Sequence, residues 1–448
     1  MKVLLISANT VRVPYHVYPL GLDYVAGAIP DRHTVKIADI NMVNHVSGLP
    51  DMINGFHPQV IGISIRNIDN GEINDARGFL KECLDLIDTI RKHSRATIVV
   101  GGSGFTLFAS KLMDLLKADY GIIGEGERLP MLLDALESGK DIAAIPGVIT
   151  AGTKEAFPPP LGIPLNGVVR ANTVAQFYVR HGGILNLQTK RGCPYHCIYC
   201  SYPHIEGRAL RLIPADQVAD RARELERAGA KYLYIADAVF NTHEEHSMEV
   251  ARAFARKGIS IPWGAFLAPT PLPENYCHVL HEAGMSHAEF GTEALSKPML
   301  ASYRKPFSVE DVFEAHAAAL DARLHVAHYI LLGGPGENRD TVMETLVNAE
   351  RLKSTVIFFF CGVRIYPHTR IYDMALQEGQ ISESDDLLEP VFYQPRLIGS
   401  EEILRMVKNH ATGRENWVIG SGGDATARLM SRLYKHGYSG PLWERLIR

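Results

Sequence analysis

Short apolar runs rich in Val and Ile alternate with amphipathic stretches through the first 150 residues of the chain. The apolar runs cover residues 2–8, 34–40, 60–65, 97–100 and 120–123, and the amphipathic stretches cover 20–29, 77–93, 105–117 and 129–138. Such alternation is typical of βαβ units, whose parallel sheet is buried on both faces. The pattern therefore predicts a doubly wound α/β domain, in which ligands bind beyond the carboxyl ends of the strands.

A second alternation of strands and helices begins near residue 184. Strand-like runs at 184–189, 232–236, 259–265, 287–291, 326–332 and 356–365 are separated by helical stretches. Six such β/α units predict a partial (β/α)6 barrel over residues 184–375. Its active site is expected at the carboxyl ends of the strands.

Two further segments complete the expected division of the chain. Residues 151–183 contain three consecutive prolines and scattered glycines with little periodicity, so we expect a linker that crosses the surface. Residues 376–448 contain helical patterns at 401–410 and 424–435 and are expected to form a small, mainly helical cap on the barrel. The remaining two segments, 1–150 and 184–375, are the expected α/β domains.

The balance of charge excludes several classes of protein. The 448 residues include 46 Lys and Arg against 50 Asp and Glu, a formal net charge of −4, which argues against a protein that coats nucleic acid or an anionic membrane. No apolar run approaches the roughly 18 residues of a transmembrane helix, and the first residues fit a buried strand better than a signal peptide. We therefore expect a cytoplasmic protein without nucleic-acid or membrane partners.

Three of the six cysteines, Cys193, Cys197 and Cys200, lie within eight residues, directly after an expected strand. A disulfide with a spare thiol is a poor explanation in a chain without secretory signals. A structural zinc ion would need a fourth ligand, for which His196 and His204 are nearby. The favoured interpretation is a [4Fe–4S] cluster held by three thiolates, which leaves one iron open. The other three cysteines are expected to be small buried side chains.

The turns after the fourth and fifth expected strands are rich in glycine. The first is Gly101-Gly102-Ser103-Gly104, and the second is Gly124-Glu125-Gly126-Glu127. Neither matches a dinucleotide fingerprint, because Leu107 stands where the first would need another glycine. Taken alone, both are explained as turns that any parallel sheet needs. Together with Arg66 and Asn67 after the third strand, they favour a site where a large flat ligand inserts a tail against bare backbone.

This N-terminal pattern resembles the Rossmann-like cobalamin-binding domain of many radical S-adenosylmethionine (SAM) enzymes. In that family the turn after strand four admits the nucleotide tail of the corrinoid, and a Gly-Glu-Gly-Glu turn follows strand five. The resemblance implies that Glu125 and Glu127 accept hydrogen bonds from cobalamin and that Arg66 and Asn67 lie beside it. His33 precedes the second strand and is expected to be an ordinary turn residue rather than a cobalt ligand.

The resemblance extends over about residues 2–375. Tyr199 fits the cysteine motif of the family, and four strand ends match its turns: Asp-x-x-Phe at 237–240, Gly-x-Glu at 291–293, Gly-x-Pro-Gly-Glu at 333–337 and Arg-x-Tyr-Pro at 364–367. It implies that Tyr199, Asp237 and Glu293 help to hold SAM beside a [4Fe–4S] cluster. Gly333 and Gly334 would let backbone approach the adenosyl part of SAM.

By this resemblance we expect a cobalamin-dependent radical SAM methyltransferase, which moves a methyl group via methylcobalamin to a carbon of a small-molecule or peptide substrate. A flavodoxin- or ferredoxin-type donor would supply electrons. A polar transfer would need a base, for which Tyr303, His328 and Tyr366 are candidates from their places near strand ends. His368 stands where relatives usually carry Gly and is expected at the surface.

Three alternatives remain at this point. A cobalamin-dependent radical enzyme that rearranges, forms or contracts a ring would need the same cofactors, and the sequence does not separate it from a methyltransferase. A transfer-RNA methylthiotransferase would need three cysteines in its first domain, where only Cys83 is present. A non-enzymatic corrinoid or iron–sulfur protein is the third alternative.

Overall fold

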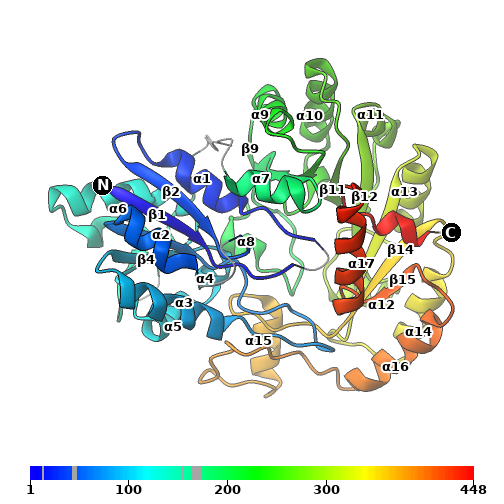
Figure 1. The fold of residues 1–448 in the computed structure, drawn as a ribbon. Helices are drawn as coiled ribbons and strands as arrows, with labels where there is room; N and C mark the ends of the chain where they lie inside the picture. Colours follow the sequence, from blue (N-terminus) through cyan, green and yellow to red (C-terminus); the bar gives the residue numbers. More distant parts are fainter. Residues whose placement is uncertain (13–14, 43–47, 154–155, 163–172, 448) are drawn as a thin grey trace.

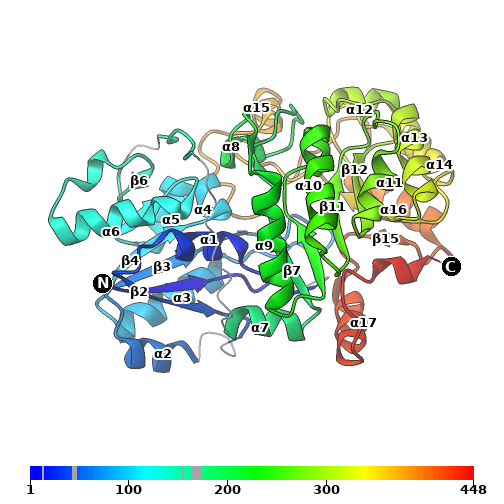
Figure 2. The same cartoon turned by 90° about the horizontal axis from the view of Figure 1, so that it is seen from above.

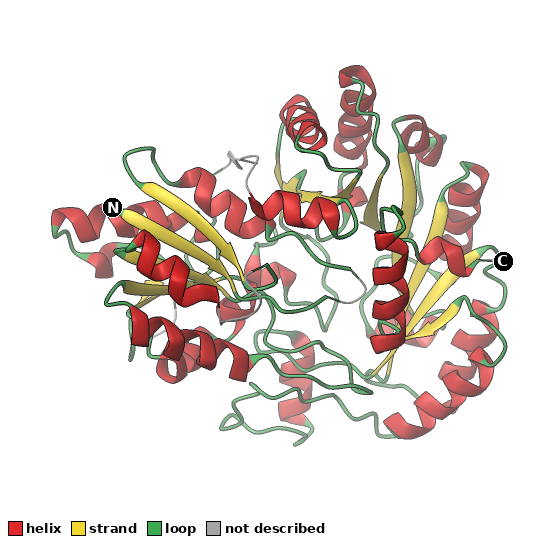
Figure 3. Ribbon diagram, viewed as in Figure 1, coloured by secondary structure: helices red, strands yellow, loops and turns green. Residues whose placement is uncertain are grey.

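Two α/β lobes lie side by side in the computed structural model (Figures 1 and 2). The structure describes residues 1–448 except 13–14, 43–47, 154–155, 163–172 and 448. Each lobe contains a largely parallel sheet with helices against it (Figure 3). Among the described residues, no helix is long and apolar enough to cross a membrane.

The N-terminal sheet has the strand order β2-β1-β3-β4-β5-β6. Its strands are β1 (Lys2–Ser7), β2 (Thr34–Asp39), β3 (Val60–Ser64), β4 (Thr97–Gly101), β5 (Tyr120–Ile122) and the antiparallel β6 (Val148–Ile149). Its helices are α1 (Leu20–Ala28), α2 (Leu49–Phe56), α3 (Leu80–His93), α4 (Ser103–Leu107), α5 (Ala109–Leu116) and α6 (Leu129–Ser138). Apolar residues of β1 and β3 point alternately into cores on opposite faces, one with α1 and α6 and the other with α2 and α3. The doubly wound prediction is confirmed.

The second sheet is a partial parallel barrel of seven strands, in the order β15-β14-β13-β12-β11-β10-β7. Its strands are β7 (Ile184–Leu187), β10 (Tyr232–Ile235), β11 (Trp263–Leu267), β12 (Met285–Glu293), β13 (His325–Leu332), β14 (Thr355–Cys361) and β15 (Trp417–Ile419). Six of them are the expected strands. The seventh, β15, comes from the segment expected to be a helical cap, because three residues are too short to show a period of two.

The helices of the second lobe follow its strands, and most of them lie on the outside of the barrel (Figure 2). They are α9 (Ala215–Arg227), α10 (Glu244–Lys257), α11 (Tyr276–Glu282), α12 (Lys297–Ser302), α13 (Val309–Asp321), α14 (Arg339–Ala349), α15 (Arg370–Gln377), α16 (Ser400–Ala411) and α17 (Gly423–Lys435). The two helices predicted in the last segment are therefore present as α16 and α17. Helix α16 packs against α14, β14 and β15, as an ordinary barrel helix does.

The expected linker contains a helix, α7 (Thr173–Arg180), so the prediction of little regular structure there is wrong at its C-terminal end. Helix α7 packs against β7 of the barrel and β2 of the N-terminal sheet. The buried Tyr178 hydroxyl on α7 donates a hydrogen bond of 2.9 Å to Asp39 Oδ2 at the end of β2. The apolar residues of α7 pack against both lobes. Residues 163–172, also in the expected linker, lie outside the described part of the chain.

The loop after β3 leaves the N-terminal sheet and reaches the barrel. Asp69 in this loop forms a buried ion pair of 3.0 Å with Arg364, which follows β14. Further along, the Glu72 carboxylate accepts hydrogen bonds from the backbone N–H of Ser421, just after β15. Because a buried charge is costly without a partner, the Asp69–Arg364 contact favours the relative position of the lobes in which the two side chains meet.

The segment η5 (Trp443–Leu446) closes the end of the barrel opposite the carboxyl ends of its strands. Trp443 packs against residues near the start of β13 and β14, including Ala327 and Val356. Its indole Nε1 donates to Glu289 Oε1 at 3.1 Å inside the barrel. Of the expected cap, the segment η5 therefore plugs the amino end of the strands, whereas β15 and α16 are parts of the barrel.

Candidate functional site

A cavity of about 580 Å³ lies between the carboxyl ends of the N-terminal strands and the barrel. From the N-terminal lobe it is lined by turns after β1, β3, β4 and β5, and from the barrel by β7, β10 and β11. The predicted site residues that line it are Arg66, Asn67, Gly101, Gly102, Ser103, Gly104, Gly124, Glu125, Gly126, Glu127, Asp237 and Tyr366. The structure thus brings together most of the residues chosen from the N-terminal turns.

The glycines after β4 allow close packing of two backbone segments. Gly102 has φ of +102°, and a Cβ there would lie 2.6 Å from the carbonyl oxygen of Ile65. A Cβ on Gly104 would lie 3.0 Å from the Arg66 carbonyl oxygen, to which the Ser103 hydroxyl donates at 2.8 Å. Gly102 and Gly104 are therefore required by the close approach of the loop after β3, and both also line the cavity.

Glu125 and Glu127 contact the barrel lobe through arginines. Arg191 donates to Glu125 Oε1 at 2.9 Å and to Glu127 Oε1 at 2.6 Å, and Arg211 donates to Glu125 Oε1 at 2.5 Å. Burial alone would raise the pKa of Glu125, but hydrogen bonds from Arg211, Arg191 and the Leu161 N–H hold it below its ordinary value. Both carboxylates therefore accept hydrogen bonds from arginine side chains of the barrel lobe.

The three clustered cysteines lie on the loop between two short antiparallel strands, β8 (Lys190–Arg191) and β9 (Arg211–Leu212). Cys193 is buried, and Cys197 and Cys200 are partly buried. Among the described residues, the one group of His, Cys, Asp and Glu side chains with all ligand atoms within 4.8 Å lies elsewhere in the chain. A structural zinc ion would need a fourth ligand, whereas a [4Fe–4S] cluster with one open iron needs only these three thiols.

A small polar group lies beside the cysteine loop. Lys305 Nζ contacts Glu293 Oε2 at 2.5 Å and donates to the Tyr199 hydroxyl at 3.4 Å. Glu293 ends β12 with φ of +55°, where a register shift interrupts its pairing with β13. Burial alone would lower the pKa of Lys305. The nearby Glu293 carboxylate and Cys197 sulfur outweigh this effect, so the pKa of Lys305 is raised. Tyr199 and Glu293 are thus brought together by Lys305, a residue that the sequence analysis did not select.

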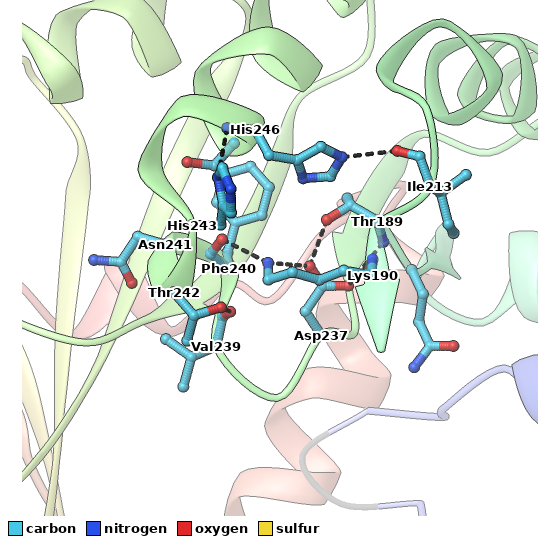
Figure 4. Close-up of polar contacts among 12 residues, drawn as sticks. Thr189, Lys190, Ile213, Asp237, Val239, Phe240, Asn241, Thr242, His243 and His246 are labelled. Carbon is cyan, nitrogen blue, oxygen red and sulfur yellow. Dashed lines mark hydrogen bonds and ion pairs between the residues drawn. The ribbon is translucent and has the colours of Figure 1, made fainter. Parts of the chain in front are cut away.

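The Asp237 side chain is bound by Thr189 and Lys190 (Figure 4). Its carboxylate accepts hydrogen bonds from the Thr189 N–H and hydroxyl and from Lys190 Nζ, the last at 2.8 Å. Lys190 Nζ also donates to the Phe240 carbonyl oxygen at 2.6 Å. Lys190 and Asp237 are both buried, so this ion pair ties the strand before the cysteine loop to the end of β10. Asp237 lines the cavity as well, with its polar contacts directed to these residues.

Gly333 lies against Gly362 and Gly334 lies against Tyr303, and neither glycine lines the cavity. A Cβ on Gly334 would lie 2.1 Å from the Tyr303 ring, and Tyr303 is fully buried with its hydroxyl donating to the Leu331 carbonyl oxygen at 2.9 Å. The Tyr303 ring also packs edge-on against Tyr199 at 5.8 Å. Tyr303 therefore packs against the cysteine loop through Tyr199 and does not line the cavity.

The other two candidate bases have different surroundings. His328 faces α13 on the outside of the barrel, where its ring nitrogens lie 2.8 Å from the Thr292 hydroxyl and 3.0 Å from His316 Nδ1. Burial lowers the pKa of His328 well below its ordinary value. Tyr366 lines the cavity, and its hydroxyl donates to Asp69 Oδ1 at 3.1 Å. The structure brings Tyr366 to the cavity and leaves His328 outside it.

His368, where the family usually has Gly, is exposed, as expected. It has φ of +65°, a backbone conformation that glycine adopts without cost. Its ring stacks on that of His204 at 3.9 Å. His33 lies in a turn before β2, also as expected.

Asn186 on β7 is a cavity residue that sequence reasoning missed. Its side chain is 95% buried, yet Oδ1 has no hydrogen-bond partner in the described part of the chain. Tyr234 and Phe266, on the neighbouring β10 and β11, line the same wall of the cavity. The period-two pattern of β7 was the available signal, because a polar residue flanked by Leu185 and Leu187 must face the barrel interior.

Two protein-family models match the chain. The radical SAM superfamily matches residues 187–348, and the B12 binding domain matches residues 6–133. The first segment lies within the barrel and ends before β14, and the second lies within the N-terminal sheet and ends before β6.

The chain is similar to several curated proteins. An uncharacterized methyltransferase of Pyrococcus horikoshii is 24% identical over 396 residues, 84% of this chain and 83% of that protein. Tryptophan 2-C-methyltransferase of Streptomyces laurentii is 23% identical, over 82% of this chain and 73% of that protein. Hopanoid C-3 methylase of Methylococcus capsulatus is 26% identical, over 69% of this chain and 60% of that protein.

Solved structures share the fold over nearly the whole chain. The radical SAM methyltransferase TsrM from Kitasatospora setae, solved with tryptophan substrate and a SAM analog, has a TM-score of 0.87 at 20% identity, covering 99% of this chain and 97% of its own. The cobalamin-dependent radical enzyme OxsB, solved with aqua-cobalamin, has a TM-score of 0.73 at 15% identity, covering 92% of this chain and 67% of its own. Both lobes and their arrangement therefore recur in known structures.

Proposed function

Because the chain belongs to the cobalamin-dependent radical SAM methyltransferases, we propose that its two lobes together move a methyl group from SAM to a carbon of a small-molecule substrate. The observation that carries this proposal is the single cavity lined by both lobes, with the cysteine loop beside it. When bound, the cluster supplies an open iron for SAM and a low-potential electron, and the corrinoid supplies a carrier for the methyl group.

The barrel side and the sheet side of the cavity bind different cofactors in this proposal. Cys193, Cys197 and Cys200 hold the cluster at the barrel side, and the bare backbone after β4 accepts the flat corrinoid and its tail at the sheet side. Lys305 and Glu293, paired beside the cysteine loop, offer an ammonium and a carboxylate to the charged groups of SAM. Holding the reactants in one enclosed space excludes water and replaces a collision by a fixed orientation.

The barrel wall of the cavity suits a small planar substrate with a hydrogen-bond donor at its edge. Phe266 and Tyr234 offer aromatic faces, and Asn186 Oδ1 offers a buried acceptor that lacks a partner in the described structure. An unsatisfied buried acceptor costs about 1–3 kcal/mol, which a donor on the ligand recovers. Tryptophan, the substrate in the TsrM structure, is a molecule of this kind.

If the transfer is polar, Tyr366 is the proposed base. It is the one of the three candidates that lines the cavity, and its hydroxyl proton already points to Asp69 Oδ1. Burial raises the pKa of Tyr366 above its ordinary value, so its hydroxyl is protonated at neutral pH, and it accepts a proton from the substrate only by passing its own proton to Asp69 Oδ1 in the same step. Asp69 is itself held by Arg364.

The proposal includes a flavodoxin- or ferredoxin-type electron donor and a location in the cytoplasm. Cys83, Cys277 and Cys361 are buried, unpaired thiols, as expected, and such thiols are compatible with a reducing compartment.

The proposal is tested by reconstituting the protein anaerobically with iron, sulfide and cobalamin, and then supplying SAM with a labelled methyl group and a panel of small aromatic acceptors. We expect about four iron atoms and one corrinoid per chain, with labelled product and S-adenosylhomocysteine. Release of 5′-deoxyadenosine without a methylated product would instead indicate a rearrangement. Failure to retain corrinoid would contradict the proposal directly.

A further inference from the structure

The cysteine loop is carried by a very short ribbon. Strands β8 and β9 pair over two residues each, with Lys190 opposite Leu212 and Arg191 opposite Arg211. Two residue pairs are too few to be stable alone in water. The pairing also sets two arginines directly across from each other, and like charges in this position repel. Contacts beyond these two pairs therefore hold the base of the cysteine loop together. Within the loop, Glu206 accepts a hydrogen bond from the Gly192 N–H, and further partners lie outside the ribbon.

Glu125 lies at this position, on the N-terminal lobe. Its Oε1 accepts from both Arg191 and Arg211, at 2.9 and 2.5 Å, so one carboxylate bridges the two opposed charges. Glu127 adds a second ion pair with Arg191 at 2.6 Å. The side chains of Glu125 and Arg191 are only 8% and 10% exposed. Pairs this well buried are screened little by solvent, and removal of either partner leaves an uncompensated charge.

The same turn belongs to the wall of the corrinoid cavity. Gly124, Glu125, Gly126 and Glu127 all line the cavity, as does Arg191. The ribbon is also tied to the barrel, because Lys190, next to Arg191, is bonded to Asp237 (Figure 4). Adjacent residues of β8 thus point to opposite lobes, and the cysteine loop begins two residues later, at Cys193.

We propose that the turn 124–127 of the N-terminal lobe is a latch that positions the cysteine loop, and hence the cluster, against the corrinoid cavity. Glu125, Glu127, Arg191 and Arg211 are positioning residues in this scheme. The inference rests on the proposed function, and it gives the two glutamates a role different from the cobalamin contacts implied by resemblance. The latch makes the order of the cluster loop depend on docking of the corrinoid lobe.

A first experiment uses the full chain without cofactors, so that it does not depend on catalysis. Hydrogen exchange of the amides in residues 190–193 and 206–212 is compared between the wild type and the Glu125→Gln/Glu127→Gln variant. We expect at least tenfold faster exchange there, with exchange in β13 and β14 unchanged, which also shows that the variant is folded. The Asp216→Asn variant, which breaks the exposed Arg256–Asp216 pair, is the matched control. Unchanged exchange in the ribbon would overturn the proposal.

A second experiment uses charge reversal and a spectroscopic readout. In the reconstituted holoenzyme, Glu127→Arg and Arg191→Glu are each expected to alter the electron paramagnetic resonance spectrum of the reduced cluster with SAM and to lower retained iron at least fivefold. The double variant, which restores an ion pair in reverse, is expected to recover both. If the double variant does not recover the spectrum and the iron content, and only the Glu127→Arg single variant loses cobalamin affinity, Glu127 is a cobalamin contact and the proposal is overturned. Loss of methyl transfer with the latch readouts intact would count against the proposed function instead.

Discussion

At the scale of single residues, the six cysteines divide into two kinds. Cys193, Cys197 and Cys200 share one loop, whereas Cys277 is a single buried thiol on α11. A cluster with three protein ligands needs all three thiolates, because loss of one leaves a second iron without protein support. An isolated buried thiol behaves as a small hydrophobic side chain.

We therefore expect Cys197→Ala to abolish iron binding and SAM cleavage. Iron content after anaerobic reconstitution should fall to the level of a protein without a cluster. Cys277→Ala is the control and should keep its iron, with only a modest loss of stability. A Cys197→Ala protein that retains a full cluster would contradict the assignment of the loop.

A pair of buried histidines predicts how stability depends on pH. Burial lowers the pKa of His316 to about 4, and His316 contacts His328 at 3.0 Å behind β13. The unfolded chain binds this proton near pH 6.5, so the folded state is fully stabilised above pH 6.5 and loses stability as pH falls toward 4. Between pH 7.5 and 5 the loss from this group is about 2 kcal/mol.

The check is urea unfolding of the wild type and His316→Gln at both pH values. The wild type should lose about 2 kcal/mol more than the variant over this interval. His278→Gln, at a half-exposed site paired with Asp321, is the control and should follow the wild type. Parallel curves for the wild type and His316→Gln would show that the pKa of His316 is the same in the folded and the unfolded protein.

At the scale of elements, the β8–β9 ribbon depends on one glycine. Gly192 has φ of +94°, and a Cβ there would lie 2.2 Å from the Ala209 carbonyl oxygen across the ribbon. The adjacent Cys193 N–H donates to the Gly207 carbonyl oxygen at 3.1 Å. A methyl group at position 192 therefore forces the two sides of the cysteine loop apart, in addition to the cost of a left-handed alanine.

We expect Gly192→Ala to weaken retention of iron about tenfold, equivalent to 1.4 kcal/mol, measured by titration of the reconstituted protein with a chelator. Gly258→Ala, at the end of α10 with φ of +63° and its nearest neighbour at 3.6 Å, is the matched control. It carries a similar backbone cost without the clash and should retain its cluster. Equal behaviour of the two variants would show that the ribbon can yield without losing the cluster.

Elements with a full period were predictable, and short ones were not. Strands β1, β3 and β13 are long apolar runs, so the sequence placed them within a few residues. Helix α7 follows a proline-rich stretch, and β15 has three residues, so neither shows a pattern that stands out locally. Their places are decided by tertiary contacts with the sheets that they join.

At the scale of the whole molecule, the amino end of the barrel is sealed by a segment that follows its last strand, β15, in the sequence. Trp443 reaches into the amino end of the barrel and donates to Glu289, which also accepts from Tyr234 and Tyr329. Burial raises the pKa of Glu289 despite these donors. The carboxylate therefore depends on all three donors for its solvation.

We expect Trp443→Phe to lower the free energy of unfolding by about 1–3 kcal/mol, because it keeps an aromatic ring but leaves Glu289 Oε1 without its donor. Trp417→Phe, at a ring packed 4.8 Å from Phe359, loses similar volume and serves as the control. Urea unfolding at pH 7.5 measures both. An equal loss in the two variants would assign the effect of Trp443 to packing alone.

The site was predictable where chemistry is local and not where it is made by two lobes. The cysteine loop and the glycine turns are recognisable from adjacent residues. Lys305 and Asn186 are single residues whose roles arise when distant strands meet, and Arg191 gains its partners from another lobe. The periodicity of a segment predicts whether it forms a helix or a strand, but it does not predict which other segment of the chain will pack against it.

The order of strands in the second sheet bears on how the protein is made. Strand β7 begins at residue 184 and β15 ends at residue 419, and both belong to one barrel. The N-terminal sheet is complete by residue 149, and domains generally fold in the order of their synthesis. On the ribosome, the corrinoid lobe is therefore ready first and offers a folded surface on which the later barrel assembles.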